Sequence, residues 1–398
     1  MDWLMSPASV LLDLPGWYLA AVLGTGFFTY YLFEVVKQPV LVCADGKFKD
    51  FLSKHVPALQ EKYWPSLWCF EARFHTAFAS LLRSIQRDIK YKREILNMSD
   101  GGHVGLDWLE TGCPDGAPIM LILPGLTGDS QSSYVKVLAT AANRMKLRVV
   151  VFNYRGLGGM SLKTPRTYNA SNPEDLSYVV NHVKSQNPGS VLVASGISMG
   201  GLLLSKYFST QQSVPEKPVL AGMVISPPWN VLKAMDNLEK PGLNFFLNRY
   251  LASGFMDYRS RHENSLEGPW DMQEILKSKT VRDFDSSYTA KQFGYRDANH
   301  YYSDASMHDK LHKIEIPLLS LSAGDDPVQP LAAIPIEEAS KSKYVAIAVT
   351  TRGGHIGFLE GILPFTYEDY MSRVFTQYFT AILTSGKDLL ASMNKHAD

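Results

Sequence analysis

The chain has 398 residues, of which 45% are hydrophobic and 20% charged, and its 39 basic and 39 acidic side chains balance. This length and composition allow a large buried core and exclude a disordered or low-complexity chain. The balanced charge, without a basic stripe, argues against nucleic acid as a partner. The three cysteines are scattered and no Cys/His cluster has zinc spacing, so we expect no metal and no other cofactor.

The first predicted element is a membrane anchor over residues 14–33, which contain no charged side chain. A helix of that length is about 30 Å long, which matches the hydrocarbon core of a bilayer. Trp17 and Tyr18 lie near one end of the run and Tyr30 and Tyr31 near the other, as aromatic side chains do at the two membrane interfaces. We therefore expect one span, preceded by a tail over residues 1–13.

Two alternatives to an anchor remain. A cleaved signal peptide usually begins with basic residues, whereas Asp2 and Asp13 precede this run and no Lys or Arg does. An interfacial or core helix is the other alternative, because Gly24, Thr25 and Gly26 weaken the hydrophobicity. Lysines follow the run, so the positive-inside rule places the globular part in the cytosol. The expected location is a single-pass position in the endoplasmic reticulum or another endomembrane.

Residues 34–88 are predicted to form a helical connector rich in aromatic residues. Phe70, Phe74, Phe78 and Leu81 recur at helical spacing, which is typical of a packed face. The basic run at residues 90–93 is predicted to be a solvated strand edge.

From residue 119 the pattern becomes strand, turn and helix, repeated. Apolar runs predict strands at residues 119–123, 147–152, 191–194, 219–225, 316–322 and 345–350, and helical patterns cover 172–182 and 201–208. Short, fully apolar strands between helices indicate an α/β fold with a mostly parallel sheet covered on both faces. The alternation stops between residues 228 and 312, and an insertion of that size predicts a helical cap over the site.

Gly196-Ile-Ser198-Met-Gly200 carries the strongest chemical signal. It joins a predicted strand to a predicted helix, and this sharp turn exposes a serine nucleophile between two glycines that avoid a clash. The motif alone is common, but here it has the required strand and helix on either side. The helix N-terminus also favours a developing negative charge.

A serine nucleophile needs a histidine base and a carboxylate that orients the histidine. In this kind of fold the chain order is Ser, then Asp or Glu, then His. Asp326 follows the predicted strand at 316–322, and His355 follows the strand at 345–350 in a glycine-rich loop. Asp325 is the alternative acid; the turn sequence favours Asp326, and Asp325 is then expected to cap the turn.

Two backbone N–H groups are expected to form the oxyanion hole. One belongs to Met199, directly after the nucleophile, and the other is assigned to Leu126 in the run Leu123–Gly128. Other histidines, among them His182 in a helix and His300 in the cap, are expected to be structural.

Several longer motifs resemble the single-pass α/β-hydrolase-domain proteins, members one and three. They are Trp68–Glu71, Leu123–Gly128, Phe152–Gly156, Gly196–Gly200, Arg282–Asp285, Phe293–Tyr295, Tyr301-Tyr302 and Gly353–Gly361. The resemblance covers nearly the whole chain after the anchor. It implies an α/β-hydrolase domain over residues 89–385, with the cap at about 228–312 and a tail over 386–398. It also implies that the family's triad falls on Ser198, Asp326 and His355.

The resemblance implies a lipid esterase that works beside a membrane without cofactor or metal. The expected activity is that of a phospholipase A acting on phosphatidylcholine with short, medium or truncated acyl chains. An acyltransferase is the first alternative, although no His has an Asp five positions later, and His103 with Asp107 is one position short. A non-catalytic binding protein on the same fold is the second alternative.

Overall fold

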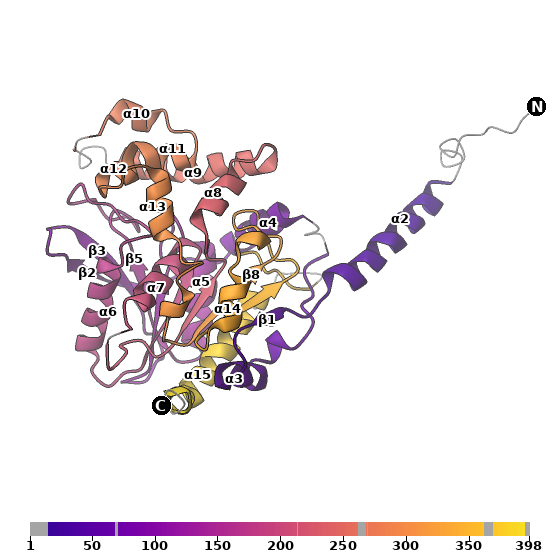
Figure 1. The fold of residues 1–398 in the computed structure, drawn as a ribbon, viewed down its shortest axis with the longest axis horizontal. Helices are drawn as coiled ribbons and strands as arrows, with labels where there is room; N and C mark the ends of the chain where they lie inside the picture. The colour runs from indigo at the N-terminus through magenta and orange to yellow at the C-terminus, as the bar shows by residue number, and fades with distance from the viewer. Residues whose placement is uncertain are drawn as a thin grey trace, which may run out of the picture.

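The computed structural model describes residues 15–67, 71–212, 214–261, 268, 270–361 and 369–394. The expected tail at 1–13, the first anchor residue, Leu14, and most of the Trp68–Glu71 motif lie outside the described residues. The described chain forms one body with a single helix projecting from it (Figure 1).

One nine-stranded sheet organises the body, in the order β1-β9-β8-β7-β6-β4-β5-β3-β2. Neighbours from β9 to β5 run parallel, while β1, β2 and β3 pair antiparallel with their neighbours. The strands are β1 (Val40–Val42), β2 (Lys92–Asn97), β3 (His103–Leu109), β4 (Ile119–Leu123), β5 (Arg148–Asn153), β6 (Leu192–Ile197), β7 (Gly222–Ile225), β8 (Leu318–Ala323) and β9 (Val345–Thr350).

The six predicted strands are all present, and the mostly parallel sheet confirms the predicted fold class. Two of the remaining three were not expected. β1 lies inside the connector that was predicted to be helical, and it pairs with β9 at the sheet edge. β3 carries His103 and Asp107 on an otherwise apolar run, which hides the pattern of a buried strand.

Helices cover both faces of the sheet because the parallel strands are apolar on both sides. On β4, Met120 and Ile122 point to one face, whereas Leu121 and Leu123 point to the other. The first face packs against α3 (Lys47–His55), α5 (Ser133–Arg144) and α15 (Tyr370–Asn394). The second packs against α6 (Glu174–Gln186), α7 (Met199–Ser209) and α14 (Ile336–Lys341).

The predicted cap is helical and lies between β7 and β8 in the chain. It forms a layer above the sheet in Figure 1. Its α-helices are α8 (Val231–Leu238), α9 (Leu243–Arg261), α10 (Met272–Leu276), α11 (Val281–Phe284), α12 (Ala290–Gln292) and α13 (Ala298–Ala305), and the π-helical turn η4 (Asp285–Thr289) joins α11 to α12.

The projecting helix is α2 (Gly16–Tyr30), which continues as the π-helical turn η1 (Tyr31–Val35). No residue of α2 is buried (Figure 1). Residues Gly16–Val35 are long and apolar enough to cross a membrane. The base of this segment is attached to the body, since the Tyr31 hydroxyl donates to the Pro65 carbonyl oxygen at 2.6 Å.

Two expectations about the rest of the chain differ from the structure. The last helix continues to Asn394, past the start of the expected tail at 386, because Leu389 is still buried against the body. The aromatic stripe of the connector lies on α4 (Ala72–Ser84), and this stripe is exposed, not packed. Its first member, Phe70, lies outside the described residues.

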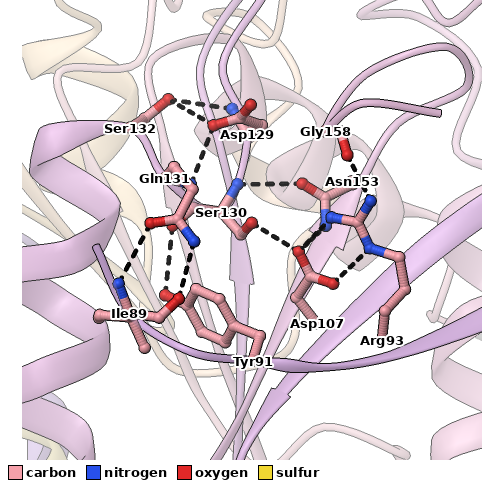
Figure 2. A network of polar contacts seen from close by, with 10 residues as sticks. All are labelled: Ile89, Tyr91, Arg93, Asp107, Asp129, Ser130, Gln131, Ser132, Asn153 and Gly158. Atoms are coloured by element: carbon pink, nitrogen blue, oxygen red, sulfur yellow. Dashed lines mark hydrogen bonds and ion pairs between the residues drawn. The ribbon is translucent and has the colours of Figure 1, made fainter.

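A buried carboxylate ties the outer strands to the loop after β4 (Figure 2). Asp107 on β3 accepts hydrogen bonds from Arg93 Nε at 2.7 Å, Ser130 Oγ at 2.5 Å and Asn153 Nδ2 at 2.9 Å. Asn153 in turn accepts from the Ser130 N–H at 3.0 Å. Burial alone would raise the pKa of Asp107, but these donors outweigh it and hold the pKa below its usual value.

Asp107→Ala is therefore expected to lower the free energy of unfolding by about 2–3 kcal/mol, because Ser130 and Asn153 lose their acceptor and Arg93 its partner. Urea unfolding at pH 7 measures the loss. A carboxyl group whose pKa is lower in the folded than in the unfolded state stabilises the fold at pH values above its unfolded-state pKa. This stabilisation is lost as the pH falls through the folded-state pKa. The gap between wild type and variant should thus narrow only below about pH 4; a gap that is constant with pH would contradict an ionised Asp107.

Candidate active site

Ser198 occupies the tight turn between β6 and α7. Its φ of 51° and ψ of −118° are strained for a residue with a side chain. The turn is closed so tightly that a Cβ at position 196 would collide with the Gly200 carbonyl, and one at position 200 with the Leu123 carbonyl. Both glycines of the motif are therefore required by space, as the sequence predicts.

The structure brings the three predicted side chains together at the carboxyl edge of the sheet. Ser198 Oγ lies 2.9 Å from His355 Nε2, and His355 Nδ1 lies 2.8 Å from Asp326 Oδ2. The distances allow a chain of hydrogen bonds from hydroxyl to imidazole to carboxylate. Such an arrangement can move a proton off the serine oxygen as it attacks a carbonyl carbon.

The two neighbouring aspartates have separate contacts. Asp326 Oδ1 accepts from the N–H groups of Val328 at 2.7 Å and Gln329 at 3.1 Å, so the residue facing His355 also caps the turn. The expectation that Asp325 caps this turn is wrong. Asp325 Oδ1 accepts instead from the Gly354 N–H at 2.9 Å, in the loop that carries the histidine. Burial raises the pKa of Asp325 to about 6.

Leu126 and Met199, whose N–H groups are the expected oxyanion donors, both line the pocket that contains Ser198 and His355. Two tyrosines hold the Leu123–Gly128 loop. The Tyr134 hydroxyl accepts from the Gly125 N–H at 3.0 Å, and the Tyr168 hydroxyl accepts from the Thr127 N–H at 3.1 Å.

The pocket beside Ser198 holds about 770 Å³ of space not filled by atoms, its open mouth included. Its walls come from the sheet edge and from the cap, and they are largely apolar; among them are Leu202, Val231, Met235, Leu251, Phe255 and Val281. An apolar pocket of this size that contains a few polar groups suits a small hydrophobic ligand.

Two polar groups in the pocket wall were not predicted from the sequence. Asp285 accepts a hydrogen bond from the Tyr302 hydroxyl at 2.8 Å, and burial raises its pKa to about 6. Asn169 uses its oxygen to accept from the backbone of Ser171 and Asn172. Among the described residues, its buried Nδ2 has no hydrogen-bond partner. In the sequence, only the motif Arg282–Asp285, which resembles the family, pointed to a role for Asp285.

The helix α4 holds the histidine loop from outside the sheet, a role that the sequence did not suggest. Thr76 Oγ1 accepts from the His355 N–H at 2.9 Å. Arg83 donates to the carbonyl oxygens of Ile356 at 2.7 Å and Gly357 at 2.6 Å. His75 Nε2 accepts from the Leu359 N–H at 2.7 Å, and burial, with Arg83 nearby, lowers the pKa of His75 to about 3. A neutral His75 fits that accepting role.

The other singled-out histidines lie away from the triad. His182 on α6 contacts Glu94 at 2.6 Å, and His300 lies on α13 in the cap. His103 pairs with Asn97 in the sheet, while Asp107 serves the network of Figure 2. Within the described part of the chain, no group of three or more His, Cys, Asp or Glu side chains could hold a metal ion.

Comparison with known proteins places this geometry in a family. The family model described as the alpha/beta hydrolase fold matches residues 118–362. Phospholipase ABHD3 of Mus musculus is 40% identical over 380 residues, which cover 93% of this chain and 91% of that protein. Phospholipase ABHD3 of Homo sapiens is 39% identical, with coverage of 93% and 92%.

Among solved structures, the esterase Pf2001 of Pyrococcus furiosus, in space group P212121, matches with a TM-score of 0.46 and 18% identity. The match covers 76% of this chain and 91% of that one. The family match spans most of the sheet, the cap and the loops that carry Ser198, Asp326 and His355. The chain therefore belongs to the alpha/beta hydrolase fold family, and within it to the α/β-hydrolase-domain proteins.

Proposed function

We propose that this protein is a serine hydrolase that cleaves acyl esters of lipids, with phospholipase A-type activity. The observation that carries the proposal is the continuous contact from Ser198 Oγ through His355 to Asp326, with Ser198 and His355 lining an apolar pocket. The relatives named phospholipase cover more than nine tenths of the chain, which supports a phospholipid as the substrate. Phosphatidylcholine with short, medium or truncated acyl chains is the substrate implied by the family resemblance.

The reaction follows from the positions of the atoms. His355 Nε2 takes the proton of the Ser198 hydroxyl while Oγ attacks the ester carbonyl carbon. Asp326 keeps the opposite imidazole nitrogen protonated and stabilises the imidazolium that forms. The N–H groups of Leu126 and Met199 receive the negative oxygen of the tetrahedral intermediate. The imidazolium then protonates the leaving alcohol, and water hydrolyses the acyl-enzyme to release the fatty acid.

The pocket suits one acyl chain because its walls are mostly apolar and the cap closes over it. Each buried methylene of an acyl chain contributes about 0.8 kcal/mol to binding, so a chain that fills the pocket binds much better than acetate. The polar pair Asp285 and Asn169 interrupts this apolar wall.

Ser198→Ala is expected to lower ester hydrolysis by roughly three to six orders of magnitude while the fold persists, because the nucleophile alone is removed. Turnover of a phosphatidylcholine with a medium acyl chain measures the effect. Ser209→Ala, at the far end of α7, is the matched control and should retain activity, since Ser209 Oγ donates to the Lys206 carbonyl within the same helix. Wild-type turnover in the Ser198 variant would reject the mechanism.

Two single substitutions distinguish the roles of Asp325 and Asp326. Asp326→Asn is expected to reduce kcat by roughly 10⁴-fold, because an amide cannot stabilise the imidazolium and favours the wrong tautomer. Asp325→Asn keeps an oxygen for the Gly354 N–H and should retain activity within about tenfold. Steady-state kinetics on the same substrate compare the two. The opposite ranking would assign the orienting role to Asp325.

We further propose that residues 16–35 anchor the protein in a membrane as a single span, in the endoplasmic reticulum or another endomembrane. The surface of α2 is apolar and none of its residues is buried against the body. Exposing so much apolar surface to water is unfavourable, which supports a position inside a bilayer. The alternative that remains is a signal sequence near the N-terminus.

Leu23→Arg, near the middle of the span, is expected to release much of the chain into the alkaline carbonate supernatant of membrane preparations. A central arginine costs about 2.5–3.5 kcal/mol on insertion scales. Trp17→Arg, near the end of the helix, is the matched control and should stay in the pellet. N-terminal sequencing of the mature protein distinguishes an anchor from a signal peptide. Residues before Gly16 in the mature protein would exclude cleavage of a signal peptide, whereas a mature chain that begins after the helix would show that the helix is a cleaved signal peptide.

A further inference from the structure

We propose that the outward face of α4 is a second lipid-binding surface, which lies on the membrane beside the anchor. This inference rests on the anchoring proposed above. Four large apolar side chains form a stripe along this face, at intervals of three and four residues: Phe74, Phe78, Leu81 and Ile85, exposed by 45%, 37%, 61% and 75%. Helical geometry places residues at these intervals on one side.

The distribution of charged and apolar residues on α4 is the reverse of that on a helix at a water-facing surface. Its buried face includes His75 and Arg83, whereas none of its exposed residues is charged. Besides the stripe, that face carries only small side chains, such as Ser80 and Ser84. A water-facing helix normally carries its charges outward and its apolar residues inward. The exposed face of α4 therefore has the composition of a surface in contact with a nonpolar medium.

The position of α4 indicates which medium covers it. The anchor helix ends against the loop that carries His355, since Arg352 donates to the Tyr30 hydroxyl at 2.6 Å. The helix α4 holds the same loop through Thr76, and Gly354 approaches the Ala72 carbonyl so closely that a side chain there would collide with it. In Figure 1, α4 lies on the body at the side from which α2 projects. A bilayer that holds α2 therefore passes next to the stripe.

The cap continues this apolar surface. The Arg73 Nε donates to Asn244 Oδ1 at 2.9 Å, which joins the start of α4 to the start of α9. The first turns of α9 expose Leu243, Phe246 and Tyr250. Further along, the same helix lines the pocket with Leu251 and Phe255. Lipid against α4 would thus also meet the cap helix that forms a wall of the pocket.

The basic side chains at the end of the stripe fit a lipid headgroup region. Three charged side chains, Arg87, Asp88 and Lys90, are exposed just beyond the C-terminal end of α4, where the stripe ends. Asp88 forms an ion pair with Lys136 at 3.1 Å. Basic side chains at the margin of an apolar surface suit the phosphates of a leaflet that contains anionic lipid.

The direct test places an environment-sensitive NBD fluorophore on Leu81→Cys of the full chain, reconstituted in phosphatidylcholine vesicles with a fifth of phosphatidylserine. Tyr178→Cys is the matched control, because Tyr178 is exposed on α6, on the opposite side of the body (Figure 1). The unsubstituted chain, treated in the same way, gives the background from the native cysteines.

We expect the probe at position 81 to emit at shorter wavelength than the probe at 178. Lipids with a doxyl group should quench it severalfold more strongly, and iodide in the water should quench it less. Equal exposure to iodide at both positions would overturn the proposal, and would leave a protein partner as the occupant of the stripe. This readout needs no catalysis, so it separates failure of the surface from failure of the proposed hydrolase.

A second measurement uses the triple substitution Phe78→Ser, Leu81→Ser and Ile85→Ser. Hydrolysis of phosphatidylcholine in vesicles should fall at least about tenfold, because losing the burial of a single apolar side chain has that effect and three are removed. Hydrolysis of a water-soluble butyrate ester by the same preparation should be unchanged, because Phe78, Leu81 and Ile85 are not among the residues that line the pocket of Ser198. Equal losses on both substrates by a variant that keeps the wild-type circular dichroism spectrum would reject a role in lipid contact.

Discussion

The convergence of three parallel strands at one sheet edge is the constraint on which the rest of the site depends. Ser198 follows β6, Asp326 follows β8 and His355 follows β9, and parallel register brings the carboxyl ends of these strands to the same side. The backbone must turn into α7 within a few residues of β6, which leaves no space for side chains at positions 196 and 200. Helices pack on both faces of the sheet, which fixes the points at which the three triad loops leave the strands.

Much of this arrangement could be predicted because it depends on local patterns. Fully apolar runs identify the parallel strands, and the motif around Ser198 follows from the steric needs of a single turn. The helical cap could be outlined because the strand and helix alternation stops there. β1 and β3 were missed because a three-residue strand has no readable period and because β3 carries a buried carboxylate.

The contacts that hold the site in place could not be predicted, since they join residues far apart in sequence. Arg83 reaches the carbonyl groups after His355, and Asp107 gathers donors from β2, β5 and the loop after β4 (Figure 2). No spacing in the sequence relates these residues. The stripe on α4 illustrates a different limit. Its helical period predicts an amphipathic helix correctly, but the period alone does not say whether the apolar side faces protein or another nonpolar medium.

The support that α4 gives to the loop of His355 also limits how far the chain can be shortened from its N-terminus without loss of activity. The region matched by the family model begins at residue 118, whereas Thr76, Arg83 and the outer strands β2 and β3 all precede it. A fragment trimmed to the recognised domain would lose the donors that grip the backbone after His355, together with Arg93 and Asp107. Segments before residue 118 therefore hold the loop that carries His355, and the structure that supports the triad extends beyond the segment matched by the family model.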